Sequence, residues 1–254
     1  MHERLSFYIK RDSLLHRANP LTKLVMVFAF ILLSYAIKQP WLPLTLIVGV
    51  VVLAFVGKVQ REFFNVSMKM VFPAAGFLFV MQALFIPGGK TLLVELWFLH
   101  LYSETLQLAF VNATRIFMLV TSFLLFILST HPSELMTDLT RRGLPGQLAY
   151  VVVSTLQILP QMQAKAAAII SAQRSRGLDT EGSLDKRVGA LGPLVGPLVF
   201  GSLVEVEERA IAIEARAFMS TLKKTSLKEV ADTRLDKALR ITLIAITVGA
   251  FLWR

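Results

Sequence analysis

The sequence predicts an all-α integral membrane protein, with about five transmembrane helices and a cytoplasmic domain of amphipathic helices inserted before the last span. Three observations support this fold class. The 254 residues are 55% hydrophobic and 17% charged, whereas soluble domains average about 45–50% apolar and about 25% charged residues. Long apolar runs approach the roughly 20 residues that a helix needs to cross the hydrocarbon layer. Basic residues are concentrated in alternate connections between these runs, which is typical of membrane topology.

Five apolar runs are the candidate spans. Four of them fill the first half of the chain, and the fifth closes it. The first, second and fifth runs are shorter than about 17 residues, so each needs its polar flanks to complete a crossing. The runs cover residues 24–37, 42–57, 70–86, 105–129 and 238–253.

The distribution of Lys and Arg sets the expected orientation. The segment before the first run carries five basic residues and the connection 57–69 carries three, whereas the other two connections carry only Lys38 and Lys90. Basic residues are enriched in cytoplasmic connections. We therefore expect a cytoplasmic N-terminus, and we interpret the net charge of +10 as a topology signal rather than as a sign of nucleic-acid binding.

The region before the last run is predicted to form one domain in the cytoplasm or at the membrane surface. Its runs 143–160 and 188–204 are apolar, but a crossing at 143–160 alone would place the basic segment 161–187 outside the cell. A hairpin of two extra spans would preserve the charge pattern and remains the alternative. The predicted division of the chain is 1–129, 130–237 and 238–254.

Two helices are predicted within this domain. The first begins at Pro160 and stops at Gly177, because proline at a helix start and glycine after its end are the usual boundaries. Its alanine-rich middle would let another helix approach closely. The Gly-Pro pairs at 192–193 and 196–197 are expected to break the next apolar run into short pieces. The second amphipathic helix is predicted over residues 202–220.

Each predicted helix has an arginine between small residues near its end. Small neighbours leave the guanidinium sterically free, and its planar fork binds a carboxylate in bidentate fashion. Each arginine taken singly could be a solvated cation at a helix end, which is the alternative. Because the two occur as a pair, we interpret them as a docking device for acidic pockets. The candidate docking residues are Ser175, Arg176, Gly177, Ala215, Arg216 and Ala217.

No catalytic, cofactor-binding or metal site is predicted. The chain has no cysteine and its four histidines are scattered, so metal-ligand spacing is not found. Residues 88–91 resemble the end of a phosphate-binding loop, but Leu84 stands where that motif requires glycine, which favours a turn. His131 and Glu134 are interpreted as part of a loop that leads to a capped helix.

Arg115 lies midway along the fourth apolar run. An ionised side chain is costly at membrane depth and normally faces protein or water. We expect a structural arginine that bonds to Asn112 or to another helix, and a substrate or gating role is the alternative.

Several motifs resemble those of the transmembrane T component of energy-coupling factor transporters, over nearly the whole chain. Near the N-terminus two segments are similar to the family's Asp-Ser-x-Leu-His-Arg and Asp-Pro-Arg-Thr-Lys patterns. The most specific similarity is to the family's two Ala-Arg-Gly coupling motifs. The similar segments are 12–17 and 19–23 for the N-terminal patterns, then Arg115, 129–135 and 143–145, and 172–179 and 214–217 for the coupling motifs.

The sequence departs from the family pattern at four of these positions. Ser175 replaces the usual alanine of the first coupling motif, which is a change between small residues. Ala217 replaces the usual glycine of the second motif, so that helix would be able to run on past it. Asn19 and Leu21 replace the acidic and basic residues common before the first span.

The resemblance implies a non-catalytic coupling subunit in the plasma membrane of a prokaryote. It would join two cytoplasmic ABC-type ATPases, through the arginines at the ends of crossing coupling helices, to a membrane-embedded substrate-binding S subunit for vitamin or transition-metal uptake. The chain itself would bind no nucleotide or other cofactor. Two other classes are considered: a self-contained permease, which would need more polar residues at membrane depth than Arg115, and a membrane enzyme, which would need a catalytic constellation.

Overall fold

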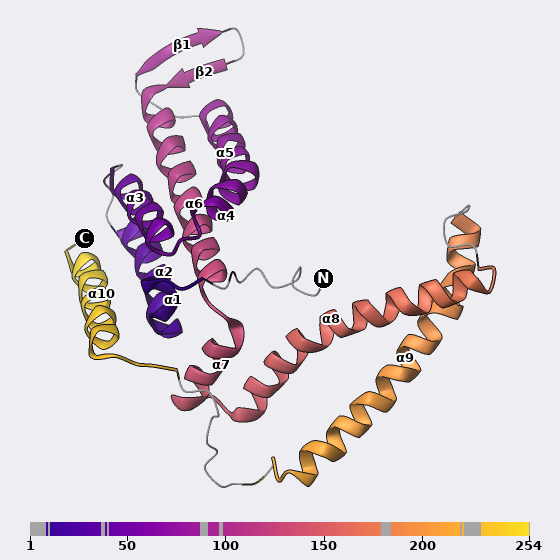
Figure 1. Cartoon of the computed structure of the whole chain (residues 1–254). Helices are drawn as coiled ribbons and strands as arrows, with labels where there is room; N and C mark the ends of the chain where they lie inside the picture. Colours follow the sequence, from indigo (N-terminus) through magenta and orange to yellow (C-terminus); the bar gives the residue numbers. More distant parts are fainter. Residues whose placement is uncertain are drawn as a thin grey trace. The chain divides into compact units, whose positions relative to one another are not determined.

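The computed structural model describes residues 9, 11–36, 39, 41–86, 91–96, 99–178, 184–218, 220 and 230–253. The chain separates into two compact units, each with its own packing. Unit 1 contains the long helices α8 (Gly146–Ser175) and α9 (Leu184–Ala215), and the remaining elements belong to unit 2 (Figure 1). Within the described residues, unit 1 spans 144–220, and unit 2 spans 9–143 and 230–253.

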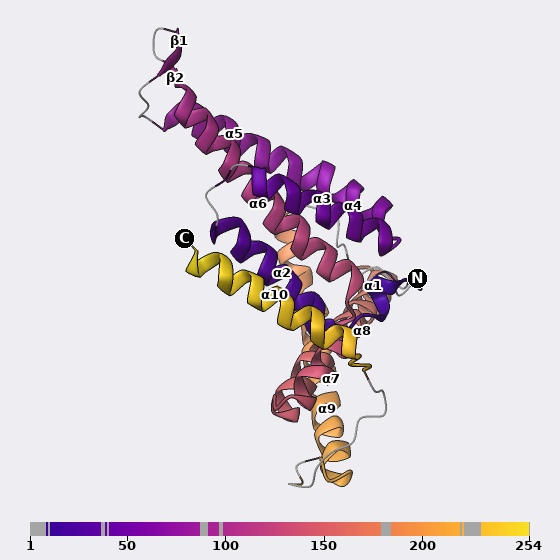
Figure 2. The same cartoon turned by 90° about the vertical axis from the view of Figure 1, so that its left-hand side faces the viewer.

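Unit 2 is a bundle of helices packed around α6 (Ser103–Ser129). Helices α2 (Pro20–Ala36), α3 (Trp41–Val56) and α5 (Phe72–Phe85) contact α6, and α10 (Arg234–Leu252) packs against α2 (Figure 1, Figure 2). The shorter elements are α1 (Leu14–Arg17), α4 (Gln60–Val66), the π-helical turn η1 (Ser67–Val71), α7 (Pro132–Arg141), and the strands β1 (Leu92–Leu96) and β2 (Leu99–Tyr102).

The core of unit 2 combines small and large side chains. Small residues on the buried face of α6, such as Ala109, Ala113 and Ser122, allow neighbouring helices to approach closely, as is common in membrane bundles. A cluster of apolar side chains then joins α1, α3, α6 and the start of α4. This cluster consists of Leu15, Val50, Ala54, Val59, Phe63, Leu125 and Leu128.

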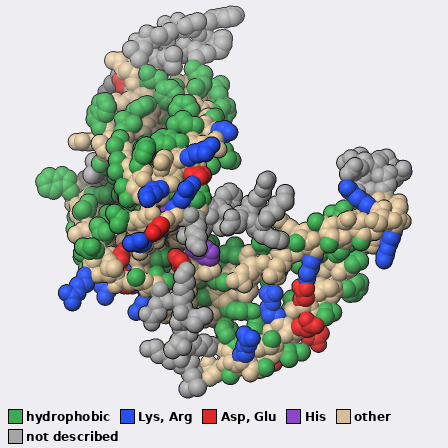
Figure 3. Space-filling view, in the orientation of Figure 1, with side chains coloured by type: hydrophobic (Ala, Val, Ile, Leu, Met, Phe, Trp, Pro, Cys, Tyr) green, Lys and Arg blue, Asp and Glu red, His purple; other side chains and the backbone are tan. Residues whose placement is uncertain are grey.

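The outward surface of unit 2 is also apolar. Phe28, Phe72 and Phe77 are each more than half exposed, which is unfavourable in water and expected where lipid covers a protein. On the face shown in Figure 3, hydrophobic side chains dominate the part of unit 2 towards the β1–β2 hairpin, and charged side chains gather towards its other end. The predicted class, a helical membrane protein, is confirmed.

Each predicted span coincides with a helix. The first, second, fourth and fifth runs correspond to α2, α3, α6 and α10, and the third is longer than expected because α4, η1 and α5 form one helix over Gln60–Phe85. Within the described residues, three helices are long and apolar enough to cross a membrane: Gln60–Phe85, Ser103–Ser129 and Val188–Ala215. The last of these lies in the region that the sequence placed at the cytoplasmic side.

A short β-hairpin between α5 and α6 was not predicted. Strand β1 pairs with β2 in antiparallel register, with Leu92 opposite Tyr102 and Leu96 opposite Leu99. The sequence missed the hairpin because periodicity alone does not distinguish a short apolar strand from a helix. Of the turn predicted at residues 88–91, only Thr91 lies within the described residues.

Both helices of unit 1 continue through prolines, which corrects two predictions. Helix α8 does not begin at Pro160 but contains it, and α9 contains both Pro193 and Pro197. The predicted breaks at the Gly-Pro pairs are therefore wrong. The predicted second helix, 202–220, is the C-terminal half of α9, and it ends at Ala215 rather than at Ser220.

A hydrogen bond from the partner helix compensates for Pro197 in α9. Pro197 lacks the N–H that would bond to the carbonyl of Pro193, four residues earlier. That carbonyl instead accepts a hydrogen bond from Nε2 of Gln173 in α8, at 3.3 Å. A contact from another helix thus satisfies the acceptor that proline leaves free.

Helices α8 and α9 pack against each other in antiparallel directions (Figure 1). Gln173 contacts Pro193, Met162 contacts Ser202, and the ring of Tyr150 contacts that of Phe218. Earlier residues of α8 therefore meet later residues of α9 along the whole length of the pair. Lys165 and Glu205 add an ion pair between the two helices.

Candidate functional site

The first candidate arginine caps the end of α8. Helix α8 ends at Ser175, and Gly177 adopts φ +86°. The N–H of Gly177 donates to the carbonyl of Arg174, and that of Leu178 to the carbonyl of Gln173, both at 3.0 Å. This bond pattern is the Schellman motif, in which a left-handed residue stops the helix. Arg176 is the capping residue itself and is exposed.

The second candidate arginine occupies the same position at the end of α9. The N–H of Ala217 donates to Glu214 at 2.9 Å, and that of Phe218 to Ile213 at 3.1 Å. Ala217 adopts φ +52°, so the suggestion that alanine would let this helix run on is wrong. The helix ends here although an alanine in the left-handed conformation costs about 1–2 kcal/mol. The next residue, Phe218, packs on Tyr150 with ring centroids 5.1 Å apart.

The two helix ends are the same structure built from different residues. Over segments 171–178 and 211–218 the third and eighth residues are half-buried and all the others are exposed. Only the alanine at the second position and the arginine at the sixth are identical. The backbone therefore presents Arg176 and Arg216 in the same local setting, at the negative end of a helix dipole that favours a cation.

The arginines lie at opposite ends of the antiparallel pair. Phe218 contacts Tyr150 near the start of α8, whereas Arg176 follows the end of α8, 26 residues after Tyr150. At 1.5 Å per residue, the two ends are separated by about 40 Å. The two arginines therefore occupy separate positions on the surface of the pair, and this spacing suits two docking sites.

Arg115 makes contact with another helix, but not through Asn112. Its guanidinium lies over the ring of Tyr35 in α2, 5.1 Å from the centroid, and its buried Nε has no hydrogen-bond partner among the described residues. Asn112 instead donates to Gln82 of α5 at 3.0 Å. The cation–π contact thus links α6 to α2. A contact with another helix was one of the two structural roles expected for Arg115.

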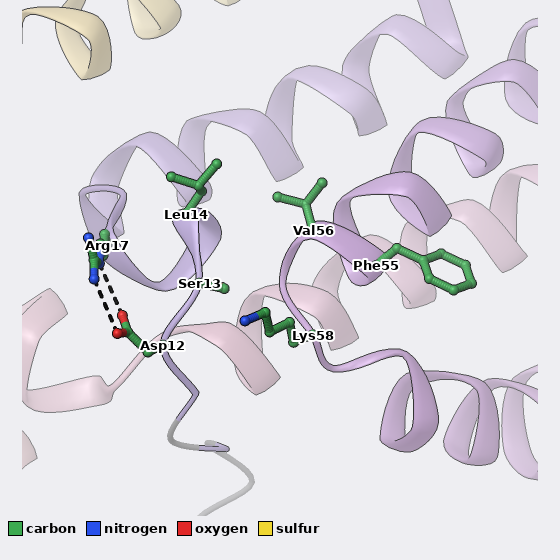
Figure 4. Close-up of a pocket in the computed structure, with 7 residues that line it drawn as sticks. All are labelled: Asp12, Ser13, Leu14, Arg17, Phe55, Val56 and Lys58. Atoms are coloured by element: carbon green, nitrogen blue, oxygen red, sulfur yellow. Dashed lines mark hydrogen bonds and ion pairs between the residues drawn. The ribbon is translucent and has the colours of Figure 1, made fainter.

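The N-terminal motif forms a capped turn beside an open hollow. Arg17 donates to both carboxylate oxygens of Asp12, at 3.0 and 3.1 Å, and these bonds hold the pKa of Asp12 below its ordinary value. Ser13 accepts from the N–H of His16 and caps α1. The hollow of about 500 Å³, shown in Figure 4, is lined by Asp12, Ser13, Leu14, Arg17, Phe55, Val56 and Lys58.

His131 begins α7 as predicted. Its ring accepts a hydrogen bond from the N–H of Ser133, so the histidine acts as the helix cap. Sequence reasoning missed a cluster of charged side chains that starts in the same helix and joins it to the segment before α10. The pair Asp138 and Arg142 could have been predicted, because opposite charges four residues apart form an ion pair on a helix. The other partners are distant in the sequence, and no sequence pattern indicates them.

Comparison with known proteins gives consistent matches over most of the chain. Residues 11–227 match the family CbiQ, described as cobalt transport protein. The chain is 31% identical over 235 residues to the energy-coupling factor transporter transmembrane protein EcfT of Bacillus selenitireducens, covering 87% of this chain and 86% of that protein. The proteins of the same name from Bacillus subtilis and Lactococcus lactis are 28% and 26% identical, each covering 97% of this chain and 96% of the relative. The chain therefore belongs to the CbiQ family, and it is a transmembrane component of a transporter of the energy-coupling factor type.

Proposed function

We propose that this chain is the non-catalytic coupling subunit of an ATP-driven importer. It transmits movement from two cytoplasmic ABC-type ATPases to a membrane-embedded subunit that binds a vitamin or a transition-metal ion. The names of its relatives support a transporter subunit, and the ATPase contacts and the cargo class are part of the proposal.

The observation that carries the proposal is the matched pair of arginine caps. Arg176 and Arg216 are exposed, have the same local backbone, and lie about 40 Å apart at opposite ends of one helix pair. Each would enter an acidic groove on a different ATPase, with Ser175 and Gly177, or Ala215 and Ala217, leaving room for the guanidinium. A bidentate contact to carboxylate requires this planar group.

The antiparallel pair is suited to transmit force because it is held together along its length. Contacts between α8 and α9 occur near both ends and in the middle. When the two ATPases close, the docked ends would move together and carry the pair as one lever. The exposed apolar residues of α8 and α9, such as Val151, Phe200 and Leu203, would then face the membrane surface or the substrate-binding subunit.

The test replaces the two arginines in the complete transporter. Arg176→Ala and Arg216→Ala should each weaken ATPase association or uncouple transport, and the double variant should abolish uptake. Losing one member of a desolvated charge pair costs about 2–5 kcal/mol, against roughly 0–1 kcal/mol for an exposed pair. Arg→Lys should rescue only in part.

Lys237→Ala is the control, since it removes an exposed cation that lies outside both coupling motifs. It should leave uptake and ATPase co-purification near wild-type levels. Wild-type uptake by the double variant at normal expression would contradict the docking role. Binding of ATP by the purified chain at micromolar concentration would contradict the non-catalytic role.

A further inference from the structure

A row of four charged side chains joins α7 to the segment before α10. Nε of Arg142 donates to Oδ2 of Asp138 at 3.0 Å, and Nη2 of Arg142 donates to Oδ2 of Asp232 at 3.0 Å. Nη2 of Arg240 donates to the other oxygen of Asp232 at 2.6 Å. The charges alternate in sign and sum to zero. Asp138 and Arg240, at the two ends of the row, are buried, with 1% and 8% of their surface exposed.

The backbone around Asp232 is fixed by other side chains. Nη1 of Arg141 donates to the carbonyl of Val230 at 3.2 Å, and Nδ2 of Asn19 donates to that of Ala231 at 3.3 Å. Residues 230–233 belong to no helix or strand. Their position is therefore set by side chains of α7, α10 and the residue that precedes α2.

This cluster lies where the chain leaves unit 2 and where it returns. The chain passes from unit 2 to unit 1 after Gly143 and returns to unit 2 at Glu229. Arg142 immediately precedes the first connection, and Asp232 follows the second by three residues. Gly143 adopts φ +115°, a conformation that favours glycine, and it redirects the backbone directly after Arg142. The Arg142–Asp232 ion pair thus ties the two connections together at their unit 2 ends.

We propose that Asp232 is a positioning residue for coupling. By holding Arg142 and Arg240 at once, it makes both connections to the α8–α9 pair move as one, so that a displacement of that pair reaches α7 and α10 together. Without the carboxylate, the irregular segment 230–233 would yield separately and absorb part of the movement. This inference rests on the proposed coupling function.

The experiment compares Asp232→Asn with wild type in the full complex of chain, ATPases and substrate-binding subunit. The complex should assemble and hydrolyse ATP, while uptake per ATP hydrolysed should fall about two- to thirtyfold, the range for residues that modulate coupling. Asp232→Glu, which keeps the charge, should retain most of the uptake. Glu62→Gln is the matched control, because it breaks another carboxylate–arginine pair of unit 2, the pair with Arg11, and it should keep wild-type uptake per ATP.

A second variant separates coupling from simple stability. The chain has no cysteine, so Arg142→Cys and Asp232→Cys can be combined and bridged by a short bismaleimide. The unbridged double variant should be uncoupled, and bridging should restore uptake per ATP. Wild-type coupling in Asp232→Asn, or no recovery on bridging, would overturn the inference. If instead the wild-type chain neither assembles with ATPases nor supports uptake, the proposed function itself fails.

Discussion

Ala217 adopts the left-handed backbone conformation that Gly177 adopts at the other helix end. A Cβ at position 177 would meet no atom within 4 Å, so the difference between the two residues there is conformational rather than steric. The same Schellman bonds form in both cases. At the end of α9, the residue that follows Ala217 also packs on Tyr150.

Replacing Ala217 by glycine should therefore stabilise the end of α9. Glycine relieves left-handed strain of about 1–2 kcal/mol but adds unfolded-state entropy, so a net gain of roughly 0.5–1 kcal/mol is expected. The reverse change, Gly177→Ala, should destabilise the end of α8 by a similar amount. Hydrogen exchange of the Phe218 and Leu178 amides in the detergent-purified protein measures both effects. Unchanged protection in both variants would contradict the strain argument.

Helix α10 begins with a reciprocal pair of side-chain caps. Oγ1 of Thr233 accepts from the N–H of Asp236, and Oδ2 of Asp236 accepts from the N–H of Thr233. Asp236 also accepts from the backbone N–H of Asn19 at 3.2 Å, which ties the start of α10 to the start of α2. Asn19, a departure from the family pattern, thus caps α2 through the N–H of Leu21 and holds the segment before α10.

Thr233→Ala should destabilise unit 2 by about 1 kcal/mol, the usual cost of losing a helix N-cap. Thr242→Ala is the matched control, because among the described residues the Thr242 hydroxyl donates to carbonyls of its own helix. This change should alter stability by less than about 0.5 kcal/mol. Thermal unfolding in detergent distinguishes the two variants. Equal melting temperatures would show that the capping box contributes nothing.

The same carboxylate predicts a pH dependence of stability. Burial by itself would raise the pKa of Asp236, but hydrogen bonds from Thr233 and Asn19 outweigh it and hold the pKa below its ordinary value of 3.8. Asp236 therefore stabilises the folded state above that value, and this contribution is lost as the pH falls through the folded-state pKa. Asp236→Asn should flatten the stability profile below pH 3.8. An unchanged acid profile would exclude this carboxylate as its source.

The membrane topology of the whole molecule can be tested with single cysteines. We predict five crossings with the N-terminus inside and residues 130–237 on the cytoplasmic side, even though α9 has the length and composition of a span. Ser171→Cys, in α8, should be protected from an impermeant thiol reagent added to intact cells. Thr91→Cys, in the connection predicted to lie outside, should react; both residues are exposed. Labelling of Ser171→Cys from outside would favour the alternative topology, in which residues 130–237 contain two extra spans.

The sequence by itself determined the membrane class, the helices at the five predicted spans, the capped start of α7 and the positions of the two arginine motifs. These features depend on composition, apolar run length and residues adjacent in the chain, so they are readable locally. Only the tertiary structure decided that α8 continues through Pro160 and α9 through Pro193 and Pro197, that Ala217 ends a helix as glycine would, and that Asp232 joins Arg142 to Arg240. In α9 the reason is visible: Gln173 supplies the hydrogen bond that Pro197 removes. A contact of this kind comes from residues distant in the sequence, so it is absent from the local pattern by which a helix boundary is predicted.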